Sequence, residues 1–545
     1  MQFSNIPDGE MSNIDIAVRE LRIIGPPGTG KTTYLSRQVA VAASKYGGKN
    51  VRAASLTRTA AAEISRRVNS VPRSNVGTLH SHAYHLLDCP DIFIGKIVIE
   101  WNEHIKKAGK PHLQLTVASG ASENDKSDFF THETIGDEYY NEISLLRSRM
   151  IPSRLWKQKL ISFYNKITAW KTEHEVLDFQ DMIAMCIDRE MLLPGKAFFL
   201  DEAQDMDLLE MSLARMWAKT MQVFIVVGDP DQNLYQWRGS DPNVFTTPKL
   251  PDDCYRILSQ SYRVPVVIHS YAVNWIEKIK NRKKAPYYPT QTRGAVHRWR
   301  RGNYKFPKPI IDEAVEYAKH GQTSMILASC SYMLEDAKRY MKLQGIPFYN
   351  PYRRKRGDWN PVNNIAKRLH SYLKTTETDD LWTAKELYEW AELLRAKDYL
   401  NRGAKKEMAE FSKGDFSENK TTLHILNILF KENYFPALHG NIDWLNKAVL
   451  PKYKKMLSYP EQVYKRAGNR YVLNARPKII LGTIHSVKGG EADNVFVFPD
   501  LSMQAMEGYI KSPDPVTRLF YVAFTRAKNK LYLCNECSGA RVKWM

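Results

Sequence analysis

The stretch GPPGTGKT, residues 25–32, is the strongest indication of fold in this chain. It follows the apolar run ELRII and opens a segment whose apolar residues recur at helical spacing. A glycine-rich turn between a strand and a helix lets backbone N–H groups approach phosphate oxygens, and the helix N-terminus favours their negative charge. The residues predicted to bind nucleotide phosphates are Gly25, Pro26, Pro27, Gly28, Thr29, Gly30, Lys31, Thr32 and Thr33.

A second motif supplies the carboxylates that a nucleotide hydrolase needs. Lys31 is expected to reach the β- and γ-phosphate oxygens and Thr32 to bind Mg²⁺. The stretch FFLDEAQD, from Phe198, places two carboxylates directly after an apolar run. Such a pair is also common at the start of a solvated helix, but after a phosphate loop it predicts that Asp201 holds Mg²⁺ and that Glu202 is the general base. The two motifs together predict a P-loop NTPase that binds a nucleoside triphosphate with Mg²⁺, a class that includes kinases, transporters and motors.

Further apolar runs extend the fold prediction to the whole chain. They are VRAASLT, QVFIVVG, SMILAS, KIILGTIHS, NVFVFPD and KLYLC. Runs of this length between helical segments indicate parallel sheets covered on both faces, so we predict an α/β fold with two sheets and mainly helical insertions. The expected division is a first core (1–86 and 176–270), a second core (271–358 and 472–545) and two insertions (87–175 and 359–471).

The stretch GDPDQNLYQWRGS, from Gly228, combines a polar group suited to sensing a γ-phosphate with two aromatic residues and an arginine. Aromatic side chains beside a basic residue offer faces on which unpaired bases stack, worth roughly 1–3 kcal/mol per base. The alternative is that these rings pack in the core.

Composition restricts the class of partner. With 545 residues the chain is too long for one core, and 79 Lys and Arg against 59 Asp and Glu give a net charge of +20. Such a surplus attracts a polyanion, either nucleic acid or an anionic membrane surface. No apolar run approaches the roughly 20 residues of a spanning helix, and the six cysteines are dispersed. We expect an intracellular, soluble protein with reduced thiols and no membrane partner.

The order of the motifs resembles the UvrD/Rep/PcrA group of superfamily 1 DNA helicases. GPPGTGKT is similar to motif I, SLTRTAAAEISRRV to motif Ia and GTLHSHAYHLL to motif Ib. LDFQDMI resembles the short acidic motif before motif II, which FLDEAQD matches, and GDPDQNLYQWRGS matches motif III. LSQSYRVP, GTIHSVKGGEADNVFV and RLFYVAFTRAKNKLYL are similar to motifs IV, V and VI. The resemblance implies two RecA-like motor domains.

It also implies roles for individual residues. Gln232 would contact the γ-phosphate, Tyr262 would stack on adenine, and Glu491 would lie near the nucleotide. Arg263 and Arg526 would reach the phosphates, Arg526 as an arginine finger. The positions implied to touch single-stranded DNA are Thr78, His80, Tyr235, Trp237, Arg238, Thr483 and His485.

The resulting hypothesis is an ATP-dependent DNA helicase or translocase acting in replication, repair or recombination. It would move on single-stranded DNA and at junctions with duplex, with 3′ to 5′ polarity implied by the resemblance. The interval between motifs IV and V is shorter than is typical, so two alternatives stay open. One is a translocase that strips proteins or remodels DNA without processive unwinding, and the other is a nucleotide-controlled binding switch.

Overall fold

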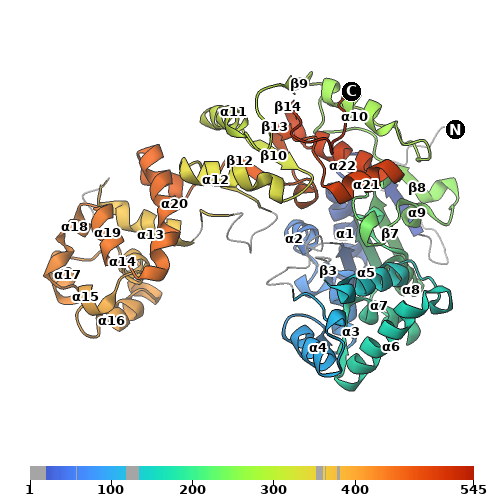
Figure 1. Cartoon of the computed structure of the whole chain (residues 1–545), viewed down its shortest axis with the longest axis horizontal. Coiled ribbons are helices and arrows are strands. Elements are labelled where there is room, and N and C mark those ends of the chain that lie inside the picture. Colours follow the sequence, from blue (N-terminus) through green and yellow to red (C-terminus); the bar gives the residue numbers. More distant parts are fainter. Residues whose placement is uncertain (1–19, 57, 118–133, 352–359, 363, 377–380) are drawn as a thin grey trace.

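Two six-stranded parallel sheets form the two cores of the protein (Figure 1). The structure is a computed structural model, and it describes residues 20–56, 58–117, 134–351, 360–362, 364–376 and 381–545. The lobe that contains the first sheet and the lobe that contains the second are called here the first and second lobe. The α/β fold with two parallel sheets, predicted from the sequence, is confirmed.

The first sheet has the strand order β3-β2-β6-β7-β1-β8. Its strands are β1 (Glu20–Ile24), β2 (Val51–Ser55), β3 (Val76–Thr78), β6 (Ala197–Asp201), β7 (Val223–Gly228) and β8 (Tyr255–Ile257). Successive residues point to opposite faces, so Phe199 packs with the helices on one face and Phe198 with those on the other. The helices around this sheet are α1 (Lys31–Tyr46), α2 (Arg58–Arg67), α3 (Leu79–Leu86), α7 (Phe179–Asp188), α8 (Leu208–Ala218) and α9 (Pro242–Thr246).

The second sheet has the order β11-β12-β10-β13-β14-β9. Its strands are β9 (Ala295–Trp299), β10 (Ser324–Ala328), β11 (Phe348–Tyr349), β12 (Ile479–Thr483), β13 (Ala492–Val497) and β14 (Ala527–Cys534). Trp275 and Phe520 belong to the core on one face, and Ile310 and Met341 to the core on the other. The helices of this lobe are α10 (Val266–Ile276), α11 (Lys308–Lys319), α12 (Glu335–Leu343), α21 (Met503–Lys511) and α22 (Asp514–Phe524).

Two helical segments extend from the lobes. The first contains α4 (Lys96–Lys107), α5 (Ile135–Ser148) and α6 (Gln158–Glu173), together with the two-stranded pair β4 (Asp91–Ile92) and β5 (Val176–Leu177). It has its own core, which includes Trp101, Phe163 and Trp170. The second projects from the second lobe on the left of Figure 1, and its aromatic core includes Trp382 and Trp390.

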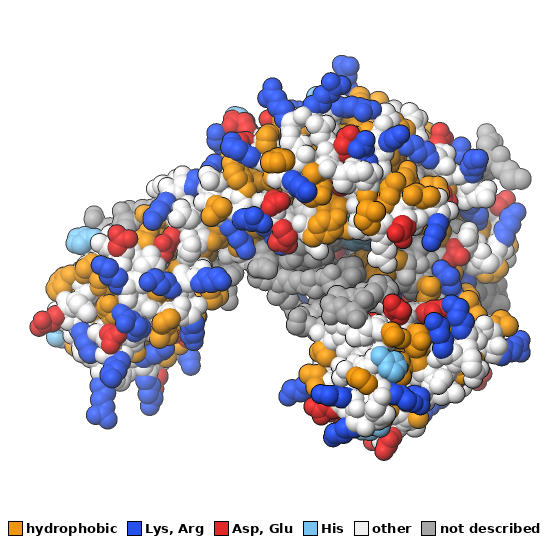
Figure 2. Space-filling view, viewed as in Figure 1, with side chains coloured by type: hydrophobic (Ala, Val, Ile, Leu, Met, Phe, Trp, Pro, Cys, Tyr) orange, Lys and Arg blue, Asp and Glu red, His pale blue; other side chains and the backbone are white. Residues whose placement is uncertain are grey.

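The helices of the second segment are α13 (Asn364–Tyr372), α14 (Ala384–Ala391), α15 (Ala396–Tyr399), α16 (Ala404–Phe411), α17 (Leu423–Leu429), α18 (Phe435–Leu438), α19 (Ile442–Ala448) and α20 (Pro451–Ala467). Figure 2 shows Lys and Arg side chains distributed over the whole face in view, including this segment. Within the described ranges, no helix combines the length and the apolar character required to cross a bilayer.

Candidate functional site

The phosphate loop connects β1 to α1. Gly28 has φ +77°, and a Cβ built there would lie 2.7 Å from the Arg263 Cβ and from the Ser261 Oγ. Only glycine fits at this approach of the loop to the segment after β8. The Lys31 ammonium donates to the Gly25 carbonyl at 2.6 Å. Burial lowers the pKa of Lys31 although the carboxylates of Asp229, Glu202 and Asp201 oppose the shift. The position of this ammonium at the phosphate loop fits a phosphate.

Asp201 ends β6 beside this loop. The Thr32 hydroxyl donates to its Oδ2 at 3.2 Å, so the predicted Mg²⁺ residues lie together. Burial, with the charge of Glu202 in addition, raises the pKa of Asp201 to about 7, which shows that the nearby cations do not balance the carboxylates. A hydroxyl and an under-compensated carboxylate fit Mg²⁺, which is commonly bound by one or two carboxylates plus substrate phosphates. Thr32 and Asp201 are therefore the residues that would hold it.

Glu202 adopts a left-handed backbone conformation, with φ +55°. Such conformations are strained for residues other than glycine and persist where surrounding contacts fix them. The Gln204 side-chain amide donates to Glu202 Oε2 at 2.6 Å. Burial would raise the pKa of Glu202, but Lys488 and Lys31 outweigh it and lower the pKa to about 2. Glu202 is thus an ionised carboxylate beside the phosphate loop.

The second lobe contributes Arg526 to the same site. Arg526 is 1% exposed, and its guanidinium donates to Gln232 Oε1 at 3.0 Å. Gln232 in turn donates to Asp229 Oδ2 at 2.7 Å. The predicted γ-phosphate sensor and the predicted arginine finger are therefore in direct contact across the boundary between the lobes.

Tyr262, Arg263 and Glu491 form the outer edge of the site. The Tyr262 side chain is 77% exposed, and its backbone N–H donates to the Gly28 carbonyl, so a free aromatic face lies next to the phosphate loop. Arg263 Nε donates to Glu491 Oε2 at 2.7 Å, and Lys528 lies 3.2 Å from Glu491 Oε1. In this conformation Arg263 is held by Glu491 of the second lobe.

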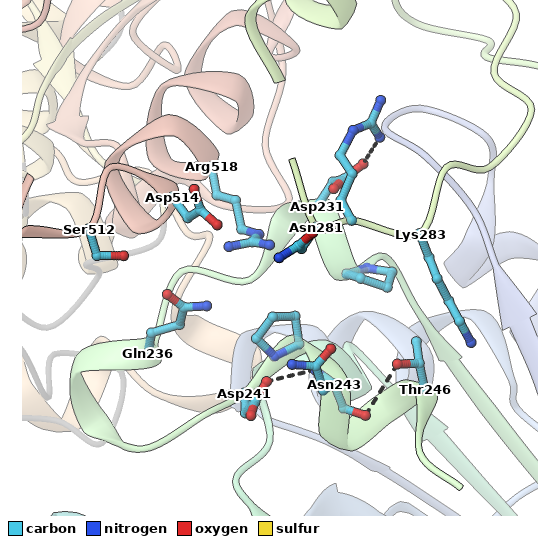
Figure 3. Close-up of a pocket in the computed structure, with 13 residues that line it drawn as sticks. Asp231, Gln236, Asp241, Asn243, Thr246, Asn281, Lys283, Ser512, Asp514 and Arg518 are labelled. Atoms are coloured by element: carbon cyan, nitrogen blue, oxygen red, sulfur yellow. Dashed lines mark hydrogen bonds and ion pairs between the residues drawn. The ribbon is translucent and has the colours of Figure 1, made fainter. Parts of the chain in front are cut away.

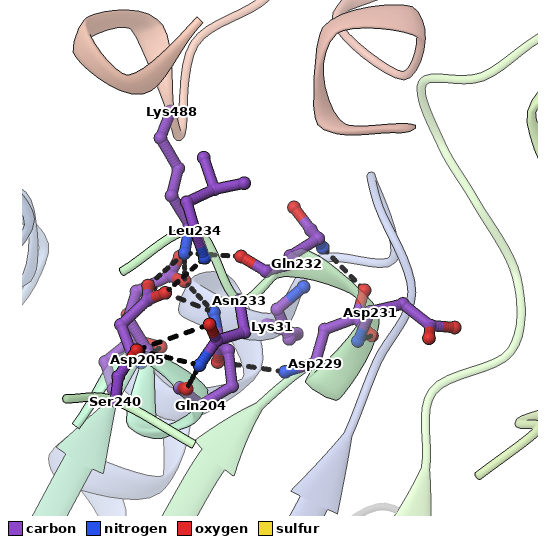
Figure 4. Close-up of polar contacts among 12 residues, drawn as sticks. Lys31, Gln204, Asp205, Asp229, Asp231, Gln232, Asn233, Leu234, Ser240 and Lys488 are labelled. Carbon is purple, nitrogen blue, oxygen red and sulfur yellow. Dashed lines mark hydrogen bonds and ion pairs between the residues drawn. The ribbon is translucent and has the colours of Figure 1, made fainter. Parts of the chain in front are cut away.

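Lys488 is a residue that the sequence analysis missed. It comes from the second lobe, forms an ion pair with Asp205 and donates to the Gln232 carbonyl at 2.9 Å (Figure 4). Its ammonium also lies 3.5 Å from Glu202 and 5.8 Å from the centre of the Tyr235 ring. The available signal was a lysine between His485 and Glu491 in GTIHSVKGGE, where only the flanking residues were assigned roles.

The predicted DNA contacts divide into two groups. The rings of Tyr235 and His485 lie 6.1 Å apart across the lobe boundary, and Trp237 is 42% exposed beside Tyr235, which contradicts core packing for this indole. By contrast, the hydroxyls of Thr78 and Thr483 accept from backbone N–H groups of their own turns. His80 and Arg238 both face the buried carboxylate Glu210. The structure thus brings together the aromatic residues but uses the other side chains locally.

A polar pocket of about 260 Å³ lies between the lobes, and Gln236 is one of the residues that line it (Figure 3). Arg518, on α22, points into it, and Arg282 pairs with Asp231 on its wall at 2.6 Å. Burial and the neighbouring Asp229 raise the pKa of Asp231 to about 7. Because its lining combines arginines with several aspartates, the pocket has no clear preference for an anion.

Comparisons with known proteins agree with this arrangement. The model of the UvrD/REP helicase N-terminal domain matches residues 12–250, and that of the UvrD-like helicase C-terminal domain matches residues 478–534. The ATP-dependent DNA helicase PcrA of Bacillus subtilis (strain 168) is 23% identical over 94% of this chain and 80% of its own length. PcrA of Staphylococcus aureus (strain MRSA252) is 23% identical over 95% of this chain and 81% of its own length.

The putative ATP-dependent DNA helicase YjcD of Bacillus subtilis is 26% identical over 48% of this chain and 37% of its own length. The domain models cover the phosphate loop and the Asp201–Glu202 pair in one lobe, and Lys488, Glu491 and Arg526 in the other. The chain therefore belongs to the UvrD/Rep/PcrA-like family of ATP-dependent DNA helicases.

Proposed function

We propose that this protein uses ATP hydrolysis, with Mg²⁺, to move along single-stranded DNA in the 3′ to 5′ direction and to open duplex at junctions. The observation that supports this most directly is the contact of Arg526 with Gln232, because it links the two lobes at the nucleotide site. Tyr235 and His485 face each other across the same boundary. Nucleotide and DNA sites would therefore both respond to a change in the lobe separation.

In the hydrolytic step, Lys31, Arg263 and Arg526 would bind the phosphates and stabilise the charge that develops on them. Bound Mg²⁺ would supply further charge neutralisation at the phosphates. Glu202 would orient the attacking water and accept its proton. Arg263 contacts Glu491 and Arg526 contacts Gln232, so a movement of either guanidinium onto the phosphates would alter contacts at the lobe boundary.

Movement on DNA requires that the nucleotide alters the stacking site. Gln232 belongs to the segment that carries Tyr235 and Trp237, and Lys488 contacts both this segment and Glu202. A change in γ-phosphate occupancy would therefore shift residues that also form the stacking site. Only a difference in binding between the two states can do work, so these contacts are the proposed switch.

Strand displacement on 3′-tailed, 5′-tailed and blunt duplexes tests this proposal. The expected result is ATP-dependent displacement of the 3′-tailed duplex alone. ATP turnover without displacement would instead support the translocase or the binding switch. A protein roadblock bound to single-stranded DNA separates those two, because only a translocase removes it in an ATP-dependent manner.

A further inference from the structure

The segment from Asp229 to Ser240, called here the stacking segment, is fixed at its first end by residues that follow the catalytic carboxylates. The Asp229 N–H donates to Gln204 Oε1 at 3.0 Å, and the Leu234 N–H donates to Asp205 Oδ1 at 3.1 Å. The Asn233 side-chain amide donates to the Gln204 carbonyl. A movement of the loop after β6 would therefore also move this end of the stacking segment.

At the other end, Ser240 hydrogen-bonds with the Asn233 side chain, and Arg238 contacts a buried carboxylate, Glu210 on α8. Its Oε1 accepts from the Arg238 guanidinium at 3.1 Å and lies 3.7 Å from His80 Nδ1. Its Oε2 accepts from the Asp207 N–H at 3.1 Å, as part of the capping box that begins α8. Because Asp207 lies two residues beyond Asp205, α8 connects the nucleotide end of the segment to its DNA end.

Because the Glu210–Arg238 ion pair is buried, it should fix the position of the Arg238 side chain. The Glu210 side chain is 3% exposed and the Arg238 side chain 12% exposed. Removing one partner of such a pair leaves a poorly solvated charge without its counterion, so the remaining group moves. The Arg238 guanidinium also lies 5.7 Å from the centre of the Tyr235 ring, within cation–π range. A displaced Arg238 would therefore release Tyr235 as well.

We infer that Glu210 is a positioning residue for DNA binding: it holds Arg238 beneath Tyr235, and Arg238 supports that ring instead of contacting a DNA phosphate. The inference rests on the proposed function, since it assigns the role of one buried carboxylate within the proposed stacking site. It also changes the role of Arg238, which the family resemblance implied to be a DNA contact.

The direction in which Glu210→Gln changes DNA affinity distinguishes this inference from a purely electrostatic effect. Glu210→Gln removes a negative charge near the DNA site, so a purely Coulombic effect would tighten the binding of a polyanion. If Glu210 positions the stacking segment, the same substitution weakens binding. The amide oxygen of the substituted side chain could still accept the Asp207 N–H, so the α8 capping box need not be lost.

The experiment measures the concentration of oligo(dT) that gives half-maximal stimulation of ATP hydrolysis, at several salt concentrations, beside a thermal melt of each variant. Glu210→Gln and Arg238→Gln are each expected to raise this concentration roughly tenfold, as expected for losing a charge-assisted hydrogen bond. The double variant should match either single variant, because both remove one interaction.

Salt dependence supplies the second readout. For Arg238→Gln the salt slope should be unchanged, whereas loss of a phosphate contact would reduce it by about 1. The matched control is Glu142→Gln, which removes an equal charge from an exposed pair with Lys157 and should change the half-maximal concentration less than about twofold.

Three outcomes would overturn the inference: tighter or unchanged binding by Glu210→Gln, additive effects in the double variant, or a reduced slope for Arg238→Gln. If Glu210→Gln fails to fold, the salt slopes of Arg238→Gln and Arg238→Lys are measured instead. Unchanged slopes would support the inference, and a reduced slope for Arg238→Gln would overturn it. Absence of any DNA stimulation in the unmodified protein would instead contradict the proposed function itself.

Discussion

Asp201 and Glu202 are neighbours whose pKa values shift in opposite directions. Burial and the adjacent charge raise the pKa of Asp201 to about 7, while Lys488 and Lys31 overcome burial and lower that of Glu202 to about 2. Separated pKa values in one buried pair are a hallmark of functional sites. Here the lowered pKa keeps Glu202 ionised, as its proposed role of proton acceptor requires, and Asp201 is the group that a cation would stabilise.

Substitution of Lys31 or Glu202 should abolish DNA-stimulated ATP hydrolysis. Lys31→Ala removes the cation expected at the phosphates, and Glu202→Gln removes the proton acceptor, so each should reduce kcat by at least roughly 100-fold. Fluorescent ATP-analogue binding separates the two, because Glu202→Gln should retain nucleotide affinity and Lys31→Ala should lose it. Near-normal turnover in either variant would remove the residue from the proposed site.

Asp201→Asn should stabilise the nucleotide-free protein at pH 8. The pKa of Asp201 is raised in the folded state, so the folded chain holds this proton more tightly than the unfolded chain. That contribution to stability is complete below the ordinary pKa near 4 and is lost as the pH rises through about 7. Asparagine mimics the protonated form, and the expected gain at pH 8 is on the order of 1–3 kcal/mol.

The same substitution should give a smaller gain at pH 5, because the pKa of Asp201 keeps this carboxyl protonated in the folded chain and it loses its proton only in the unfolded chain. Thermal melts at the two pH values measure the difference, with Asp188→Asn, at an exposed position on α7, as the control. A gain of equal size at pH 5 and pH 8 would show that the Asp201 charge is not the cause.

At the scale of elements, the long buried strands were predictable from the sequence and the short edge strands were not. β6, β7, β10 and β12 are buried throughout, so each is a continuous apolar run. β3, β8, β9 and β11 are short or only partly buried, and their sequences lack such a run. Their pairing depends on neighbouring strands that are distant in sequence.

In the candidate site, too, the residues encoded by a local motif were predictable, and those that depend on distant partners were not. Residues within a local motif, such as Thr32 and Asp201, were predicted because the motif itself places them. Lys488 and Glu210 were missed because their importance comes from partners in other elements. The stretch LDFQDMI shows this too: its two aspartates cap α7 and then bind Arg147 of α5 and Lys171 of α6.

Lys171→Met should therefore destabilise the joint between the first helical segment and the first lobe. Lys171 is 3% exposed and donates to Asp178 at 2.6 Å and Asp181 at 2.5 Å. Its removal leaves two poorly solvated carboxylates that share the Arg147 guanidinium, which should cost about 3–5 kcal/mol. Urea unfolding followed by tryptophan fluorescence measures the loss, since Trp170 lies beside this cluster in sequence.

Lys157→Met is the matched control, because it breaks an exposed pair with Glu142 and should cost less than about 1 kcal/mol. Equal losses in the two variants would mean that burial of the Lys171 cluster has no special effect on the joint.

At the scale of the whole molecule, each part of the surplus positive charge should act on DNA less strongly the farther it lies from the stacking site. The basic stretch between α10 and α11 is partly engaged elsewhere: Arg282 pairs with Asp231, and Lys278 lies 3.5 Å from the centre of the Trp275 ring. Arg300 and Arg301 follow β9, whereas His485 follows β12, with three strands between them in the second sheet. Four strand spacings amount to about 19 Å.

This separation exceeds the screening length of roughly 8–10 Å near physiological salt. The double substitution Arg300→Gln/Arg301→Gln should therefore leave the slope of log affinity against log salt concentration almost unchanged for a short oligo(dT). Two lost phosphate contacts would reduce this slope by about 1.4. Fluorescence anisotropy across a salt series measures the slope. Lys405→Gln/Lys406→Gln, on the exposed face of α16, is the control for the same loss of net charge. A reduced slope in the arginine variant alone would place the DNA track across β9, and equal reductions in both would make net charge the determinant.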